Sequence, residues 1–252
     1  MRVVSLVPSL TEALIDFGLG ASIVGRTRYC EEPADVVAGI ETVGGTKNPD
    51  VERIIALRPD LVIVNKEENR IEDCQALEAA GIALHVTHPR TVQEAASMIQ
   101  ELGAACGAGE RSTALAEDIR ASLAAHAADA GGREAVRTFC PIWRKPYMTF
   151  RRATYIGDML AHAGCDNIFG DAADTDFFEV SVEQILQAKP ALVVLPDEPY
   201  VFEPRHAEEL REAGVNAQFL HLDGKDLAWY GPRIPHALRR LSEAVTSVAA
   251  RR

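Results

Sequence analysis

Two glutamates with matching surroundings are the residues of this sequence best suited to bind a charged partner. Glu52 follows Asp50 and Glu183 follows Ser181, and Asp and Ser commonly cap the first turn of a helix. A single carboxylate in a first helical turn is explained by its favourable interaction with the helix dipole. Two carboxylates at equivalent places in two halves of one chain also predict a pair of exposed acceptors for the arginines of a protein partner.

Aromatic residues interleaved with arginine, proline and glycine form the second candidate site. Of the fifteen Phe, Tyr and Trp residues, thirteen lie between residues 139 and 230. Three groups, at 143–152, 177–178 and 229–233, fall in predicted loops at strand or helix ends. Because open α/β sheets bind ligands at the carboxyl ends of their strands, these groups predict one wall of a ligand cleft. The alternative, a place in the ordinary core, is what we expect for Phe139, Phe169 and Phe219.

The usual signatures of an enzyme are missing from the sequence. There is no P-loop, no G-x-S-x-G elbow and no H-E-x-x-H motif. Gly18-Leu19-Gly20 begins like a dinucleotide fingerprint, but Ile23 replaces the third glycine, so a helix end and turn is expected and a dehydrogenase is disfavoured. The five cysteines form no C-x-x-C pair, and His85 and His88, the closest histidines, are interpreted as surface or loop residues. We therefore predict no catalytic residue, no metal site and no cofactor.

Composition narrows the class of protein further. The chain has 252 residues, of which 47% are hydrophobic, and this content excludes intrinsic disorder. With 26 Lys and Arg against 37 Asp and Glu, the net charge of -11 has the wrong sign for nucleic acid. No apolar run approaches the roughly 18 residues of a membrane span. No signal peptide precedes the first predicted strand, so the chain as written is expected to be soluble and not exported.

Short apolar runs alternate with helical patterns along the chain, which predicts an α/β fold with parallel strands. Ser9 with Glu12, and Thr91 with Glu94, have the spacing of capping boxes at helix starts. The predicted strands lie at 3–7, 61–64, 82–86, 136–142, 192–195 and 219–222, and the predicted helices at 11–17, 92–102, 155–163, 205–213 and 235–249.

An internal repeat divides the chain into two lobes. Residues 51–62 match residues 182–193 in Val, Glu, Ile, Pro, Leu and Val. In both copies a helix ends at a basic residue and Pro, and the chain enters a buried strand. Coincidence between two αβ units is the alternative, but the shared glutamate favours duplication. The Ala-rich segment between the copies predicts one long helix, which gives an N-terminal lobe at 1–106, a connecting helix at 107–132 and a C-terminal lobe at 133–252.

Over nearly its whole length the chain resembles the class III periplasmic binding proteins of ABC importers, the helical-backbone receptors for vitamin B12, haem and ferric siderophores. Among these, it is most similar to the vitamin B12 receptors. The order of the motifs carries the resemblance, since each piece alone is weak. The motifs are residues 2–9 with Thr11 and Glu12, Val43-Gly44-Gly45-Thr46, residues 51–54, residues 57–62, Asp166-Asn167-Ile168-Phe169 and residues 180–184.

The resemblance implies a fold of two Rossmann-like α/β lobes joined by a single long helix, with the ligand cleft between the lobes. It implies a monomer in the periplasm or another extracytoplasmic space that binds cobalamin or another metal chelate, such as haem or a ferric siderophore, without converting it. Glu52 and Glu183 occupy the positions that dock on the ABC permease dimer with its ATPase.

The resemblance also places the ligand site. Tyr29, Thr46 and Phe177 correspond to pocket residues of the vitamin B12 receptors, with Thr46 and Phe177 standing where those receptors have tryptophans. Aromatic residues would stack on the ligand, and Arg233 or Arg151 would bind its carboxylates or phosphate. The full expected ligand-binding set is Tyr29, Thr46, Lys47, Asn48, Trp143, Tyr147, Phe150, Arg151, Phe177, Trp229, Tyr230 and Arg233.

A second hypothesis is a cytoplasmic protein that keeps the receptor fold and handles a corrinoid, tetrapyrrole or metal chelate, as an enzyme in one version. The missing signal and the odd number of cysteines favour it. So does the lack of the family's disulfide, because Cys165 is offset and Ser242 stands near the partner position.

Overall fold

The computed structural model describes residues 1–130 and 134–249, which divide into two compact units. Unit 1 consists of Met1–Pro89, Glu94–Asp118 and Tyr230–Pro232. Unit 2 consists of Arg90–Gln93 and the described residues of 119–229 and 233–249. The chain therefore passes from one unit to the other several times.

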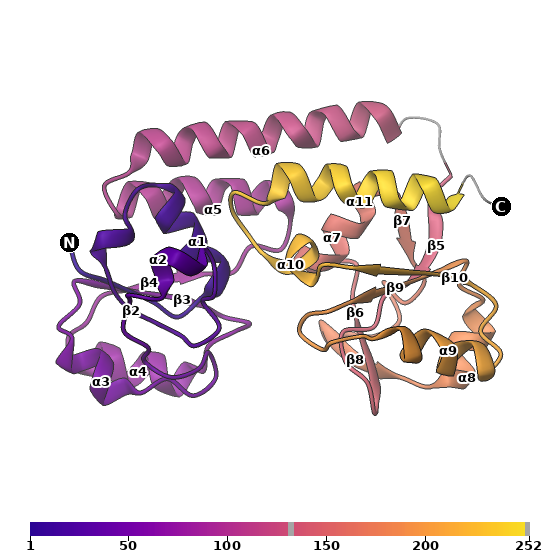
Figure 1. Cartoon of the computed structure of the whole chain (residues 1–252), viewed down its shortest axis with the longest axis horizontal. Helices are drawn as coiled ribbons and strands as arrows, with labels where there is room; N and C mark the ends of the chain where they lie inside the picture. The colour runs from indigo at the N-terminus through magenta and orange to yellow at the C-terminus, as the bar shows by residue number, and fades with distance from the viewer. Residues whose placement is uncertain (131–133, 250–252) are drawn as a thin grey trace. The chain divides into compact units, whose positions relative to one another are not determined.

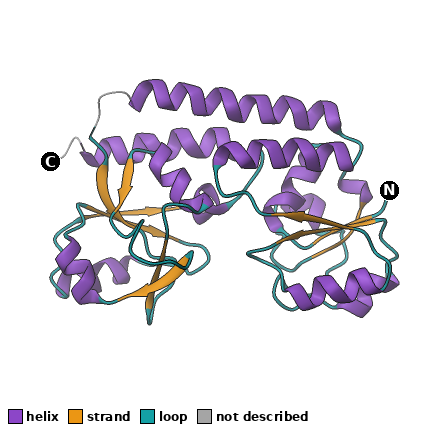
Figure 2. Cartoon of the chain, turned by 180° about the vertical axis from the view of Figure 1, so that it is seen from behind, coloured by secondary structure: helices purple, strands orange, loops and turns teal. Residues whose placement is uncertain are grey.

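Unit 1 is built on a parallel four-stranded sheet in the order β2-β1-β3-β4. Helices α3 and α4 cover one face of this sheet, where Ile54 and Leu77 pack against Val4, Val62 and Val64. Figures 1 and 2 show α1 and α5 on the opposite face. The elements are β1 (Val3–Ser5), α1 (Pro8–Asp16), the short turn η1 (Gly20–Ser22), β2 (Ile23–Arg26), α2 (Ala34–Val37), α3 (Val51–Ala56), β3 (Leu61–Asn65), α4 (Ile71–Ala79), β4 (Leu84–Thr87) and α5 (Val92–Ala105).

Unit 2 has a second parallel sheet, in the order β10-β9-β5-β7, and a separate antiparallel ribbon of β6 and β8. Helices α8 and α9 cover one face of the sheet, where Ile185 and Leu210 join Phe139, Val193 and Leu195 in one core. The elements are β5 (Val136–Phe139), β6 (Tyr147–Phe150), α7 (Tyr155–His162), β7 (Cys165–Asn167), β8 (Phe177–Val180), α8 (Val182–Ala188), β9 (Leu192–Pro196), α9 (Pro204–Glu212), β10 (Gln218–Leu222), α10 (Gly224–Ala228) and α11 (Ile234–Ala249).

The two parallel sheets share one topology. If the ribbon is set aside, β5, β7, β9 and β10 are the first to fourth strands of unit 2, and their order across the sheet is that of β1, β2, β3 and β4. The predicted repeat lies at the same place in both units, as α3 followed by β3 and as α8 followed by β9. The similarity therefore extends from the sequence of one segment to the arrangement of each sheet.

The ends of the repeated helices are built alike. Arg58 and Lys189 both have a φ of 48°, in the left-handed region, and each is followed by a proline that prevents the helix from continuing. In unit 1 the guanidinium of Arg2 donates hydrogen bonds of 3.1 and 2.8 Å to the carbonyl oxygen of Leu57. In unit 2 Arg137 donates one of 2.5 Å to the carbonyl oxygen of Ala188, the residue equivalent to Leu57. An arginine just before β1 or within β5, the first strand of each unit, thus satisfies a free carbonyl at the end of the repeated helix.

The segment predicted as a connecting helix contains α6 (Gly109–Ala130). Ile119 and Leu123 of α6 are buried, and the boundary between the units falls between Asp118 and Ile119. The predicted boundary at residues 132 and 133 lies outside the described residues. Within residues 1–130 and 134–249, no helix is long and apolar enough to cross a membrane.

Two predictions about local structure are wrong. Helix α1 begins at Pro8 after Val7, with Ser9 buried inside its first turn, because a proline is favoured at the first helical position. Ser9 therefore does not cap the helix. The segments 143–152 and 177–178, predicted as loops, contain strand β6 and the start of β8, in which Tyr147 pairs with Val180 and Phe150 with Phe177. Pairing of aromatic and β-branched residues across the ribbon stabilises these strands.

The cap of α8 gives a test of the fold. Ser181→Ala removes the acceptor for the Gln184 N–H, so the free energy of unfolding of unit 2 should fall by about 1 kcal/mol. Ser181→Asp, which keeps an acceptor, should retain most of it. Both tryptophans, Trp143 and Trp229, lie in unit 2, so urea unfolding followed by tryptophan fluorescence reports on this unit. Ser247→Ala, at an exposed position on α11, is the control, and an equal loss in this control would contradict the capping role.

Candidate functional site

The two glutamates predicted to dock a partner occupy equivalent, exposed positions in the first turns of α3 and α8. Asp50 caps α3, since its Oδ1 accepts a 2.9 Å hydrogen bond from the Arg53 N–H. Ser181 caps α8 through a full capping box with Gln184. These caps, both predicted, fix the backbone from which Glu52 and Glu183 project.

Local hydrogen bonds favour the charged form of Glu183. Bonds to its carboxylate from its own backbone N–H and from the Ser181 side chain lower the pKa of this exposed group. Glu183 is therefore an ionised carboxylate at neutral pH and presents a negative charge at the surface of unit 2.

The predicted ligand-binding residues of unit 1 lie around one turn that follows β2. The Gly45 N–H donates a 3.2 Å hydrogen bond to the Asn48 carbonyl oxygen, and Gly44 has a φ of 100°, which closes the turn. Tyr29 is 53% exposed, and a Cβ atom added to Gly45 would meet its Cε2 at 3.3 Å. The Tyr29 ring and the turn are thus in contact and form one surface.

Side chains at the ends of β3 and β4 hold this turn in place. Asn69 Nδ2 donates hydrogen bonds of 3.0 Å to the Thr46 carbonyl oxygen and 3.3 Å to that of Leu6. Lys47 Nζ donates one of 2.6 Å to the carbonyl oxygen of Glu67, and Glu67 Oε1 lies 3.4 Å from His88 Nε2. The set lies at the carboxyl ends of parallel strands, where open α/β sheets bind ligands.

In unit 2, Trp143 belongs to an aromatic cluster that the sequence did not predict as a whole. Its ring is 45% exposed and meets Tyr200 edge to face, with the centroids 5.4 Å apart. Tyr200 in turn contacts Phe202, at 4.9 Å, and His206, at 5.7 Å. The exposed indole is therefore held from one side by a packed aromatic group.

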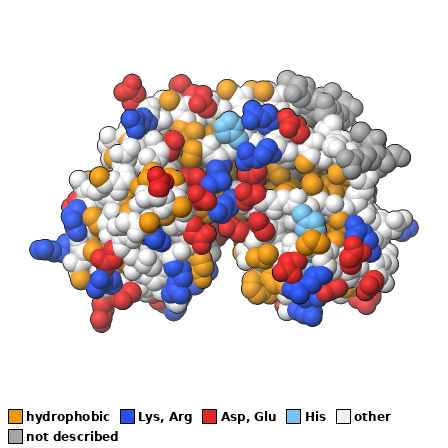
Figure 3. Space-filling model, viewed as in Figure 1, with side chains coloured by type: hydrophobic (Ala, Val, Ile, Leu, Met, Phe, Trp, Pro, Cys, Tyr) orange, Lys and Arg blue, Asp and Glu red, His pale blue; other side chains and the backbone are white. Residues whose placement is uncertain are grey.

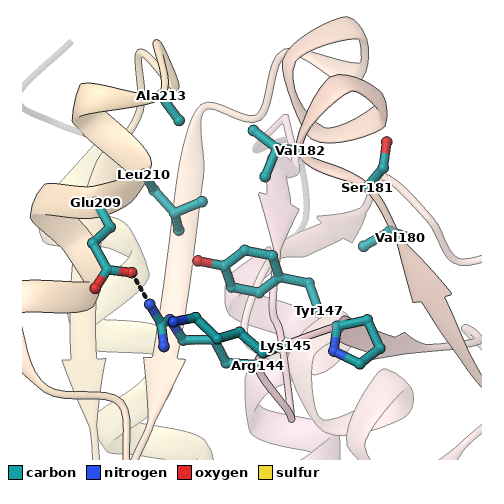
Figure 4. Close-up of a pocket in the computed structure, with 10 residues that line it drawn as sticks. Arg144, Lys145, Tyr147, Val180, Ser181, Val182, Glu209, Leu210 and Ala213 are labelled. Carbon is teal, nitrogen blue, oxygen red and sulfur yellow. Dashed lines mark hydrogen bonds and ion pairs between the residues drawn. The ribbon is translucent and has the colours of Figure 1, made fainter.

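Arg144 joins this cluster to Tyr147. Its guanidinium pairs with Glu209 and hydrogen-bonds to the side chains of Tyr200 and Tyr147. Burial raises the pKa of Tyr147, so its phenol stays protonated. Figure 4 shows the Tyr147 ring pointing into a pocket of about 380 Å³ between α9 and the start of α8. The lining residues are Arg144, Lys145, Pro146, Tyr147, Val180, Ser181, Val182, Glu209, Leu210 and Ala213.

Trp229 is buried, unlike the half-exposed Trp143. Its side chain is only 7% exposed, and its Nε1–H donates a 3.0 Å hydrogen bond to Glu198 Oε2. Lys225 Nζ and Arg233 Cζ each lie 5.2 Å from its ring centroid, within the range of cation–π attraction. The predicted stacking of Trp229 on a ligand requires an open ring face, whereas in this structure the ring is occupied by these protein contacts.

The remaining predicted residues are mostly buried. Phe150 is fully buried and Tyr230 is 4% exposed, so both contribute to packing and present almost no surface to a ligand. Phe177, paired with Phe150 across the ribbon, is half-buried. Arg151 donates a 3.0 Å hydrogen bond to the Asp174 carbonyl oxygen. Tyr29, Thr46, Lys47 and Asn48 are therefore brought together in unit 1, whereas the predicted residues of unit 2 fall into separate groups.

Sequence reasoning missed several residues of these sites. Glu67 and His88 lie within two residues of the ends of β3 and β4, and Glu198 and Tyr200 lie in the loop that follows β9. Only their position after a buried strand could have indicated a role in a site, because no sequence motif marks them. In the part of the chain that the structure describes, no group of three or more His, Cys, Asp or Glu side chains is arranged to hold a metal ion.

Charges are mixed on the surface. On the face drawn in Figure 3, acidic and basic side chains are interspersed, and no continuous basic area is seen there.

Comparison with known proteins identifies similar chains. The sequence profile of the family described as periplasmic binding protein matches residues 3–217. The vitamin B12-binding protein of Yersinia pestis is 28% identical over 247 residues, which cover 98% of this chain and 87% of that protein. That of Vibrio parahaemolyticus is 28% identical over 218 residues, which cover 86% of this chain and 75% of that protein.

The fold is shared with solved structures. The periplasmic vitamin B12-binding protein of Vibrio cholerae superposes with a TM-score of 0.84 at 24% identity, over 98% of this chain and 97% of that one. A periplasmic haem-binding protein from Roseiflexus sp. RS-1 gives 0.82 at 24% identity, over 98% of both chains. The predicted fold class, two α/β lobes with parallel sheets, is confirmed by this likeness.

The contact between Glu198 and Trp229 predicts a pH effect. Burial raises the pKa of the Glu198 carboxyl, although the hydrogen bond from Trp229 opposes the shift. Between its unfolded and folded pKa values the folded state then binds more protons, so this carboxyl makes stability fall as pH rises. Glu198→Gln should remove that contribution. As the pH rises above the ordinary glutamate pKa, the free energy of unfolding of wild type should therefore fall relative to that of Glu198→Gln.

Urea unfolding followed by tryptophan fluorescence at several pH values measures this difference. Glu179→Gln, at an exposed position of the same unit, is the control and should show no such trend. A difference between Glu198→Gln and wild type that stays constant with pH would show that burial does not perturb this carboxyl.

Proposed function

Because this chain belongs to the periplasmic binding protein family, we propose that it is the solute-binding protein of an ABC importer and that its ligand is a corrinoid or a similar metal chelate. The observation that supports this most is the family match over residues 3–217, which extends through both α/β units. The proposed ligand class follows the similar proteins, of which those of Yersinia pestis and Vibrio parahaemolyticus are named for vitamin B12 and that of Roseiflexus for haem.

The exposed aromatic side chains suit a large, flat ligand. Tyr29 in unit 1 and Trp143 in unit 2 each have about half of their surface exposed, and an aromatic ring exposed in this way can stack on a macrocycle. Lys47 and Asn48, both exposed, add donors and an acceptor for polar groups at the edge of the ligand. We propose binding without chemical conversion, with no resident cofactor, by a monomer.

Glu52 and Glu183 are proposed to dock the protein on a permease dimer that works with its ATPase. Each unit contributes one exposed carboxylate, and each stands on a capped helix with the same local structure. Two charge-assisted hydrogen-bonded pairs with permease arginines would fix the orientation of the protein. This role places the protein in the periplasm, as the family name implies. The cytoplasmic alternative on the same fold is not favoured by the comparisons.

Ligand titration tests the proposed function. The protein should bind cyanocobalamin, ferric haem or a ferric siderophore, with a change in absorbance, heat and melting temperature. Trp143→Ala removes an exposed stacking surface and should weaken binding by about tenfold, since a stacked ring contributes roughly 1–3 kcal/mol. Thr46→Ala, in which a small side chain is shortened, is the matched comparison and should weaken binding less. No response to any of the three ligand types would refute the proposed function.

Docking is tested separately from ligand binding. Glu52→Gln and Glu183→Gln keep the side-chain shape but remove the charge, so each should lower affinity for the permease–ATPase complex by about tenfold. Ligand affinity should not change. Glu110→Gln, an exposed carboxylate in the first turn of α6 without a counterpart in the repeat, is the control. Binding to the surface-immobilised permease–ATPase complex measures these affinities. If Glu52→Gln and Glu183→Gln bind the complex as tightly as wild type does, the docking role is excluded.

A further inference from the structure

His88 and Glu67 form a pair at the edge of the unit 1 sheet. Strands β3 and β4 are parallel neighbours with Asn65 opposite Thr87, so the residues that follow these strand ends come close together. His88 Nε2 lies 3.4 Å from Glu67 Oε1, and the two side chains are 30% and 24% exposed. The pair is thus accessible from solvent but partly enclosed by the protein.

Glu67 is fixed in position by its backbone. Its N–H donates a 2.8 Å hydrogen bond to Asn65 Oδ1, and its carbonyl oxygen accepts one of 2.6 Å from Lys47 Nζ. Its Oε1 atom is buried and has no hydrogen bond of good geometry within residues 1–130 and 134–249, so the His88 ring is the polar group it faces. A buried carboxylate oxygen of this kind favours a ring N–H directed at it.

This arrangement selects one tautomer of the imidazole. With the proton on Nε2 directed at Glu67, the lone pair is on Nδ1, the other ring nitrogen. Histidines that bind metals commonly donate their second ring N–H to a carboxylate, which fixes the ring and makes the ligating nitrogen more basic. In the Glu67–His88 pair the two atoms lie 3.4 Å apart without a hydrogen bond of good geometry, so a small movement of either side chain completes this arrangement.

The pair adjoins the residues already expected to bind the ligand. Lys47, which contacts Glu67, belongs to the same turn as Thr46 and Asn48, and Tyr29 lies against that turn. Lys47 thus connects this turn to the residue whose side chain faces His88.

We propose that His88 coordinates the metal of the bound chelate through Nδ1, with Glu67 as the residue that positions its ring. The inference rests on the proposed function and deepens it, because it restricts the ligand to chelates with an exchangeable axial position, such as ferric haem or an aqua-corrinoid. The Nδ1–metal bond forms as a metal-bound water leaves. The proton stays on Nε2, next to Glu67, and no electron is transferred.

Absorption spectra of the whole protein with ferric haem and with aquocobalamin test this inference. Wild type should shift the spectrum of at least one of them, as expected when imidazole replaces water. His88→Ala should lose the shift and bind that chelate about tenfold or more weakly, and added imidazole should restore the spectrum. Glu67→Gln should lower the affinity by about tenfold while keeping a weaker shift. His236→Ala, at an exposed position of α11, is the control and should behave as wild type.

Cyanocobalamin separates this inference from the proposed function, because both axial positions of its cobalt are already filled. His88→Ala should bind it as wild type does, and its melting temperature without ligand should be close to that of wild type. If wild type and His88→Ala give the same spectra and affinities with ferric haem and aquocobalamin, His88 is not a metal ligand and the proposed function stands. If wild type binds none of these chelates, both fail.

Discussion

Each unit depends on the way its repeated helix ends. A residue in the left-handed region, Arg58 or Lys189, followed by proline stops the helix and directs the chain into a central strand of the sheet. The guanidinium of Arg2 or Arg137 then binds a carbonyl left free at the helix end. Because this helix also carries Glu52 or Glu183 at its capped start, the segment that leads into a central strand also presents the exposed carboxylate.

The two units share a topology but differ in what is added to it. Unit 2 contains the ribbon of β6 and β8, and much of its aromatic content lies in or beside this ribbon and the strand ends that follow it. Unit 1 has no described counterpart of the ribbon within residues 1–118. Its site instead consists of polar side chains around one tight turn, with Tyr29 as the aromatic member. The ribbon, which contains Tyr147, Phe150, Phe177 and Phe178, therefore accounts for part of the uneven distribution of aromatic residues along the sequence.

Much of the framework could be predicted from the sequence, because apolar periodicity, proline placement and the repeat are local signals. The caps Asp50 and Ser181 follow from residue type and spacing and are confirmed. The ribbon was missed because its paired residues are 27 to 33 positions apart in sequence and are of types that also occur in loops. The burial of Trp229 was missed for a similar reason, since its partner Glu198 precedes it by 31 residues. Contacts between residues so far apart in the sequence can be identified only from the folded structure.

We propose that the protein delivers a metal chelate to an ABC permease. This delivery can be measured as ATP hydrolysis by the permease–ATPase complex in lipid vesicles, with the protein added in its free and ligand-loaded forms. We expect the loaded protein to raise the rate of hydrolysis above that of the complex alone, and we expect loss of both Glu52 and Glu183 to abolish the increase. A rate that is the same with and without the loaded protein would contradict the proposed delivery.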